Sequence, residues 1–214
     1  MLINCVAYKD GSKLGDVATD DISDYLAQPG CFVWVALKDA TPEELSKMQE
    51  EFGLHDLAIE DARHGHQRPK IEEYDDTLFA VLHTVEIGPT DDLVIGEVDI
   101  FIGTNFVLSC RNRTQQGFLG VRARAEREPH LLRHGPAFVF YALMDAVVDR
   151  YFPIIDALET DLEVVEEQIF EPRLGRDNIQ QLYALKGRIM TVKHVVAPLA
   201  ESVGKLTMGR VPRV

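Results

Sequence analysis

Hydrophobic residues follow two different periodicities along the chain. Up to about residue 112, short runs of bulky and β-branched residues alternate with short amphipathic stretches, which is typical of strands mixed with short helices. From about residue 135 onward, apolar residues recur every three or four positions almost without interruption, which indicates long helices. The pattern therefore predicts an α+β protein in two units: an α/β domain with a mixed sheet over residues 1–134, and a long antiparallel helical hairpin over residues 135–214.

Local signals place the elements of the first unit. Residues 31–37, CFVWVAL, follow Pro29 and Gly30 and are typical of a buried strand. Thr41, Pro42 and Glu44 form the pattern of a capping box with proline in the first turn, so a helix is expected from there to about residue 52. The other expected elements are a helix over residues 57–62, strands over 77–86, 94–102 and 106–110, and a helix over 115–128; the last two strands are expected to form a hairpin.

The second unit carries the seam of a coiled coil. One helix is expected from Pro136 to about residue 170, with Pro153 as the point of a bend, and a second helix from about residue 177. The predicted seam residues are Leu182, Leu185, Ile189, Val192, Val196, Leu199, Val203 and Leu206 on the second helix, and Leu158, Leu162, Val165 and Ile169 on the first. An alternative is that this stripe of apolar residues packs only onto the first unit.

Charge narrows the range of partners. Asp and Glu number 35 against 22 Lys and Arg, for a formal net charge of -13, so nucleic acids would be repelled and cations attracted. An acidic surface that serves only solubility has the same composition. The three cysteines are odd in number and widely spaced, which favours neither a disulfide framework nor a thiolate zinc site. The longest apolar run, residues 137–144, is shorter than the roughly 20 residues that a spanning helix needs, so the chain as given is expected to be soluble.

Motifs of catalysis are absent from the sequence. It contains no glycine-rich phosphate loop, no nucleophile elbow and no HExxH helix, so we expect no catalytic residues and no enzyme. A metal-dependent hydrolase that used Glu60, Asp61, His64 and His66 is an alternative, although no nucleophile or base can be named for it.

Carboxylates concentrate between residues 145 and 171, in a stretch without lysine. Asp145 and Asp149 are four residues apart on one helical face, where like charges are destabilising. Water, basic residues of the following helix, or cations could relieve this repulsion. Mg²⁺ often takes only one or two carboxylates and keeps several waters, so scattered acidic side chains are compatible with a Mg²⁺ site.

Four segments carry a resemblance to a known family. Residues 54–62, LHDLAIEDA, and 66–76, HQRPKIEEYDD, closely resemble the N-terminal signature of the CorA magnesium and cobalt transporters. Residues 97–108 resemble the paired strands of that family, and residues 143–152 resemble the start of its acidic helix. The resemblance therefore extends over nearly the whole chain.

The resemblance implies the cytoplasmic part of a homopentameric channel at the inner face of the cell membrane, with a stalk helix and two membrane helices beyond Val214. In the family, regulatory Mg²⁺ bound between neighbouring cytoplasmic domains holds the channel closed. The matching ligands here would be Asp61, supported by Glu60 and Asp145, with Co²⁺ or another divalent cation as alternatives. Because the opposing stalk carboxylate lies outside this sequence, we expect a site that is only partly built.

The resemblance leaves two other functions open. Zinc-transporting relatives share the same architecture, although HQRPKIEEYDD is closer to the magnesium branch. A coiled-coil scaffold without any transport function is the second alternative. The leading prediction is a divalent-cation-sensing regulatory domain of a magnesium and cobalt channel.

Overall fold

A seven-stranded mixed sheet forms the centre of the computed structural model, which describes residues 1–169 and 176–207. The strand order is β2-β1-β3-β7-β6-β5-β4; β3 and β7 pair in parallel and all other neighbours are antiparallel. The predicted α+β class with a mixed sheet is confirmed. The strands are β1 Leu2–Lys9, β2 Ser12–Asp16, β3 Cys31–Lys38, β4 Lys70–Tyr74, β5 Thr77–Ile87, β6 Leu93–Ile102 and β7 Phe106–Asn112.

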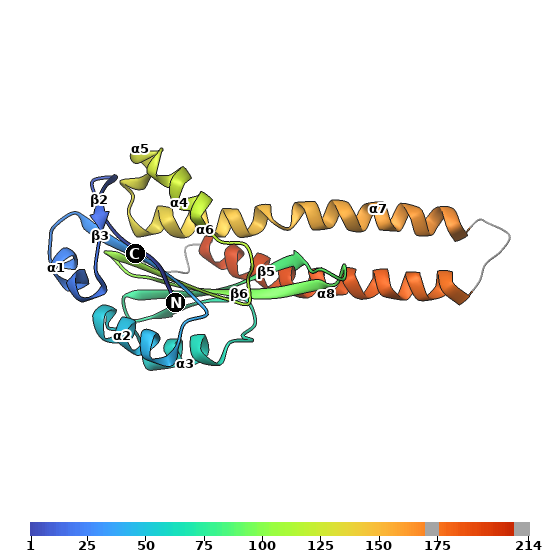
Figure 1. The fold of residues 1–214 in the computed structure, drawn as a ribbon, viewed down its shortest axis with the longest axis horizontal. Helices are drawn as coiled ribbons and strands as arrows, with labels where there is room; N and C mark the ends of the chain where they lie inside the picture. The colour runs from blue at the N-terminus through green and yellow to red at the C-terminus, as the bar shows by residue number, and fades with distance from the viewer. Residues whose placement is uncertain (170–175, 208–214) are drawn as a thin grey trace.

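Helices cover both faces of this sheet (Figure 1). One face carries α1 Ile22–Leu26, α2 Pro42–Phe52 and α3 Asp56–His64, preceded by the short 3₁₀ helix Thr19–Asp21. The other face carries α4 Leu119–Glu126, α5 Pro129–Leu132 and α6 Pro136–Asp149. The remaining helices, α7 Phe152–Ile169 and α8 Arg176–Thr207, lie antiparallel and project beyond the sheet as a hairpin.

Burial on both faces explains the apolar character of the central strands. In β6, Val98, Ile100 and Ile102 pack into one core cluster, whereas Phe101 packs into the cluster on the opposite face. A strand that is covered on both faces has a nearly continuous run of apolar residues in its sequence, as residues 31–37 do. The division of the chain at residues 134 and 135 stays a prediction, and the structure places α6 on the sheet itself.

The predicted start of α2 is confirmed, whereas the predicted start of α4 is not. The Thr41 hydroxyl accepts a hydrogen bond from the Glu44 amide at 3.2 Å, and the Glu44 carboxylate accepts one from the Thr41 amide at 2.9 Å, as a capping box requires. The helix expected over residues 115–128 is shorter, because α4 begins only at Leu119. The loop before it is fixed by the Arg150 guanidinium, which donates to the Gly117 carbonyl at 2.7 Å and lies 4.2 Å from the centre of the Phe118 ring.

The long helix is interrupted next to Pro153, where the sequence predicted a bend. It divides into α6, which ends at Asp149, and α7, which begins at Phe152. Proline has no amide hydrogen and its ring clashes with the preceding helical turn, so the first turn of a helix, where Pro153 lies in α7, is the position that accommodates it best. A proline inside a helix removes one backbone hydrogen bond, as Pro198 does in α8. The intervening Tyr151 is buried, and its hydroxyl donates a hydrogen bond to the His83 carbonyl of β5.

The hairpin is confirmed, but three of its predicted seam positions face outward. Leu158, Val165, Leu185, Val192 and Leu199 are buried as predicted. Leu182, Leu162 and Ile189 were expected in the seam, but they are 44%, 39% and 42% exposed, so that part of the prediction is wrong. The predicted seam residues Val196, Val203 and Leu206 are half-buried and pack against the core. In α8, Val195 and Ser202 are buried and Arg188 is half-buried, and Asp161 of α7 is half-buried. The predicted seam position at residue 169 lies outside the described side chains.

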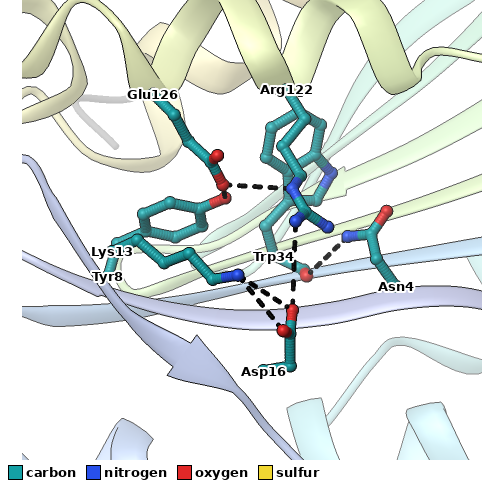
Figure 2. A network of polar contacts seen from close by, with 7 residues as sticks. All are labelled: Asn4, Tyr8, Lys13, Asp16, Trp34, Arg122 and Glu126. Atoms are coloured by element: carbon teal, nitrogen blue, oxygen red, sulfur yellow. Dashed lines mark hydrogen bonds and ion pairs between the residues drawn. The ribbon is translucent and has the colours of Figure 1, made fainter.

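A polar network joins the β1–β2 edge of the sheet to α4 (Figure 2). The buried Tyr8 hydroxyl donates to the Glu126 carboxylate at 2.8 Å, and the Arg122 guanidinium donates to the same carboxylate at 3.0 Å. Arg122 also lies 3.9 Å from Asp16, which receives Lys13 at 3.1 Å. Burial and the Glu126 carboxylate together raise the pKa of the Tyr8 hydroxyl far above its usual value, so this hydroxyl stays a donor.

No helix within residues 1–169 and 176–207 is both long enough and apolar enough to cross a membrane.

Candidate divalent-cation site

Helix α3 presents Glu60 and Asp61 at the edge of the sheet. The helix packs through Ala58, Ile59 and Ala62, which are buried. The Glu60 side chain is on the exposed side, whereas the Asp61 side chain is only 25% exposed. The helix ends at His64 and is followed by Gly65, whose φ of 60° is readily adopted by glycine. Adjacent positions on one helix thus give the two carboxylates different surroundings.

Asp61 is engaged by a lysine from the edge strand. The Lys70 ammonium lies 2.8 Å from Asp61 Oδ2 and 2.5 Å from Glu72 Oε2, and Glu72 also accepts the Tyr74 hydroxyl at 3.0 Å. The ammonium is 5.9 Å from the centre of the Phe79 ring. Burial acts to lower the pKa of Lys70, but the hydrogen bonds to Asp61 and Glu72 outweigh it, so the pKa lies above its usual value. Lys70 is therefore a firmly charged cation between two carboxylates.

Two further carboxylates lie beneath this group on β6. Glu97 is 1% exposed and Asp99 is 0% exposed. Glu97 Oε2 accepts a hydrogen bond from the backbone amide of Gln67 at 3.0 Å and lies 3.7 Å from His83 Nε2. Asp99 Oδ2 accepts a hydrogen bond from the side-chain amide Nδ2 of Asn112 at 3.2 Å. The second oxygen of each, Glu97 Oε1 and Asp99 Oδ1, has no hydrogen-bond partner in the described part of the chain. Burial, and then the charges of Glu97 and Asp61, raise the pKa of Asp99 well above its usual value.

Asp145 lies on the other side of the molecule. It belongs to α6, which packs against the sheet face opposite to that covered by α3. Its carboxylate accepts a hydrogen bond from the Arg124 guanidinium at 2.7 Å, and this bond raises the pKa of Arg124. One chain therefore brings Glu60 and Asp61 together but does not bring Asp145 to them. Within residues 1–169 and 176–207, no group of three or more His, Cys, Asp or Glu side chains is arranged to hold a metal ion.

The two histidines near Asp61 have separate partners. His64 Nδ1 lies 2.9 Å from the Glu60 carbonyl, and His66 Nδ1 lies 3.1 Å from Arg113 Nη2. His66 also has a positive φ of 59°, at the turn that leads into β4. These contacts give no support to a hydrolytic centre built from Glu60, Asp61, His64 and His66.

Comparison with known proteins identifies the family. The model of the family described as "CorA-like Mg2+ transporter protein" matches residues 30–210. The chain belongs to this family. The match covers the sheet from β3 onward together with α3, the lysine-bearing strand β4 and both hairpin helices.

Among curated CorA-like relatives, a putative metal ion transporter YfjQ of Bacillus subtilis is 30% identical over 168 residues, which are 78% of this chain and 51% of the relative. The cobalt/magnesium transport protein CorA of Thermotoga maritima is 29% identical over 164 residues, which are 76% of this chain and 46% of the relative. The chain thus spans about half the length of these relatives.

Two solved structures share the CorA-like fold. The soluble domain of CorA from Methanocaldococcus jannaschii superimposes with a TM-score of 0.68 at 17% identity, covering 96% of this chain and 80% of that one. The ZntB cytoplasmic domain from Vibrio parahaemolyticus gives a TM-score of 0.71 at 12% identity, covering 98% and 80%. At these identities the likeness concerns the fold alone.

Sequence reasoning did not single out Lys70, Glu97 or Asp99. The sequence does contain a signal for Glu97 and Asp99. They are two residues apart in an otherwise apolar strand, so both side chains must face the same side of the sheet. Lys70 lies inside residues 66–76, a segment that resembles the CorA family. Its pairing with Asp61 depends on how the edge strand β4 passes the end of α3, which no local pattern reveals.

Proposed function

We propose that this chain is the regulatory, divalent-cation-sensing part of a transporter that moves Mg²⁺ or Co²⁺ across a membrane. The observation that carries the proposal is the CorA-like family match over residues 30–210. It is supported by the curated relative from Thermotoga maritima, which is described as a cobalt/magnesium transport protein. In a transporter of the length of these relatives, this part would lie at the cytoplasmic face of the membrane.

The placement of the candidate ligands favours a site between subunits. Asp61 and Glu60 lie at an exposed edge of one sheet face, and Asp145 lies on α6 at the other face. A cation that contacted all three would have to join neighbouring copies, which agrees with the homopentamer implied by the family resemblance. Carboxylates that meet between subunits repel one another, and a cation bound between them would neutralise this repulsion. Such a cation would therefore hold the subunits together. By linkage, divalent cations would then favour the assembled, closed state of the transporter.

The test uses the full-length protein. Mg²⁺-dependent protection from proteolysis should be strong in the wild type and lost in Asp61→Asn. Asp24→Asn is the matched control, because Asp24 is an exposed aspartate on α1 at a distance from α3 in the sequence. Sodium at equal ionic strength should not replace Mg²⁺, since general screening of the acidic surface would respond to both salts. Equal protection of Asp61→Asn and wild type would show that Asp61 is not a sensing ligand.

A zinc-transporting function is the second candidate, because the fold is shared with the ZntB cytoplasmic domain. Uptake of Mg²⁺, Co²⁺ and Zn²⁺ by the full-length protein, measured in parallel, separates the two. A coiled-coil scaffold would be favoured if none of these cations were taken up and none changed the stability or assembly of the chain.

A further inference from the structure

We propose that the Lys70 ammonium is an internal competitor for the divalent cation at Asp61, so that cation binding requires this ammonium to leave Asp61 or to share it. This inference rests on the proposed sensing function of Asp61 and concerns the regulation of that same site. Lys70 would thereby set the cation concentration at which the site fills.

The Lys70 ammonium already engages the carboxylate that the proposed cation would bind. Its Nζ is within hydrogen-bond distance of carboxylate oxygens from two elements, Asp61 on α3 at 2.8 Å and Glu72 on β4 at 2.5 Å. Lys70 and Asp61 each have 25% of the side chain exposed, so the pair is partly shielded from water and from salt. A hard cation seeks the same oxygen atoms that the ammonium now engages.

The buried acids explain why the ammonium stays near the site. Glu97 and Asp99 lie beneath it, each with one unpartnered oxygen among the described residues, and the positive charge of Lys70 opposes the rise in the pKa of Asp99. Complete removal of Lys70 would leave these carboxylates without that charge, which is costly in a buried setting. Glu72 offers a second partner, so Lys70 can release Asp61 while it remains beside the acidic group.

Either mode of binding lowers the affinity for a divalent cation. If the cation takes Asp61 Oδ2, a hydrogen bond between Lys70 and Asp61 must be broken. If it takes the other oxygen, two like charges lie close together in a partly desolvated site, where Coulomb repulsion is stronger than in water. Neutralising Lys70 while keeping its length should therefore tighten divalent-cation binding.

The experiment measures Mn²⁺ binding to the isotope-labelled chain from paramagnetic line broadening of the amides of residues 60–62, with Mg²⁺ as competitor. Lys70→Met should bind Mg²⁺ about fivefold or more tightly than wild type, a coupling in the usual range between linked sites. Lys70→Arg keeps the charge and should bind like wild type. Lys47→Met is the matched control, because Lys47 pairs with Thr19 and Asp20 rather than with Asp61.

Two outcomes separate this inference from the proposed function. If Asp61→Asn binds Mg²⁺ as wild type does, the sensing role of Asp61 is wrong. If Asp61→Asn loses binding but Lys70→Met binds no more tightly than Lys47→Met, the competition by Lys70 is overturned while the sensing role stands.

A second pair of variants decides the matter if circular dichroism shows that Lys70→Met does not fold. Glu72→Gln removes the alternative partner of Lys70, so the ammonium should hold Asp61 more firmly and Mg²⁺ binding should weaken. Glu73→Gln removes the same charge from the neighbouring exposed position. A weakening that is larger for Glu72→Gln supports the competition, and equal effects of the two variants reject it.

Discussion

Arg188 of α8 forms an ion pair with Asp161 of α7 inside the seam of the hairpin. Apolar residues lie on both sides of the pair, Leu158 and Val165 on α7 and Leu185 and Val192 on α8. Arg188 also reaches Asp91 in the turn between β5 and β6, at 3.6 Å, which ties the hairpin to the sheet. A polar residue at a core position of a coiled coil fixes register at some cost in stability. This pair accounts for the outward position of the next residue on each helix, Leu162 and Ile189.

Truncation at two neighbouring positions of α8 should have very different effects. Leu185→Ala removes a buried side chain from the seam and should lower the free energy of unfolding by about 2–5 kcal/mol. Ile189→Ala, four residues later on an exposed face, should change it by less than about 0.5 kcal/mol. Urea unfolding of both variants measures the difference. Similar losses for the two would show that Ile189 is covered in solution.

The Arg188–Asp161 pair should contribute modestly to stability. Because Asp161 remains 45% exposed, a double-mutant cycle with Arg188→Ala and Asp161→Ala should give a coupling free energy of about 0.2–1 kcal/mol. The coupling should fall as salt is added, since ions screen partly exposed charges. A coupling that does not respond to salt would indicate that packing, and not charge, joins the two side chains.

Gly11 should not tolerate even a methyl group. It has a φ of 83°, and a Cβ atom there would lie 2.1 Å from the Pro129 carbonyl oxygen at the start of α5. Gly11→Ala should therefore cost more than about 1 kcal/mol, through both backbone strain and the clash. Gly15→Ala, in β2, is the control, because no atom lies within 4 Å of its added Cβ. Thermal unfolding of the two variants makes the comparison, and equal midpoints would contradict the close approach of the β1–β2 turn to α5.

Asp99 should make stability depend on pH. Its pKa is raised in the folded state, so the folded chain binds the proton more tightly than the unfolded chain does, and stability decreases as the pH rises through the folded-state pKa. Asp99→Asn removes this cost and should be more stable than wild type at neutral and alkaline pH. The difference should shrink as the pH falls and vanish below the unfolded-state pKa of about 3.8, where Asp99 is protonated in both states.

Denaturant unfolding over a pH series measures this effect. Asp76→Asn, at an exposed position, is the control. A difference between Asp99→Asn and wild type that stayed constant with pH would show that Asp99 does not titrate as proposed.

Local chemistry made some of the helix starts and the pairing of β6 with β7 predictable. The capping box at Thr41 and the break at Pro153 depend on residues close in sequence, so these features could be predicted before the fold was known. The first two strands were not predicted individually, although Asp10 and Gly11 are a strong signal for a tight hairpin turn and both have positive φ. The CorA-like resemblance was likewise contained in short contiguous segments, and the family match bears it out.

Long-range packing decided the rest. A stripe of apolar residues allows several rotations of a helix, and the pairing of Arg188 with Asp161 and Asp91 is what distinguishes the observed rotation. The sequence by itself determined the α+β class, the start of α2 and the interruption near Pro153, and its resemblance to the CorA family suggested the acidic candidates Glu60, Asp61 and Asp145. Only the tertiary structure placed Asp145 on the opposite side of the sheet from Asp61. It also brought Lys70 into contact with Asp61. The physical reason is that ion pairs and sheet faces depend on contacts between segments far apart in the chain, whereas caps and turns depend on neighbours.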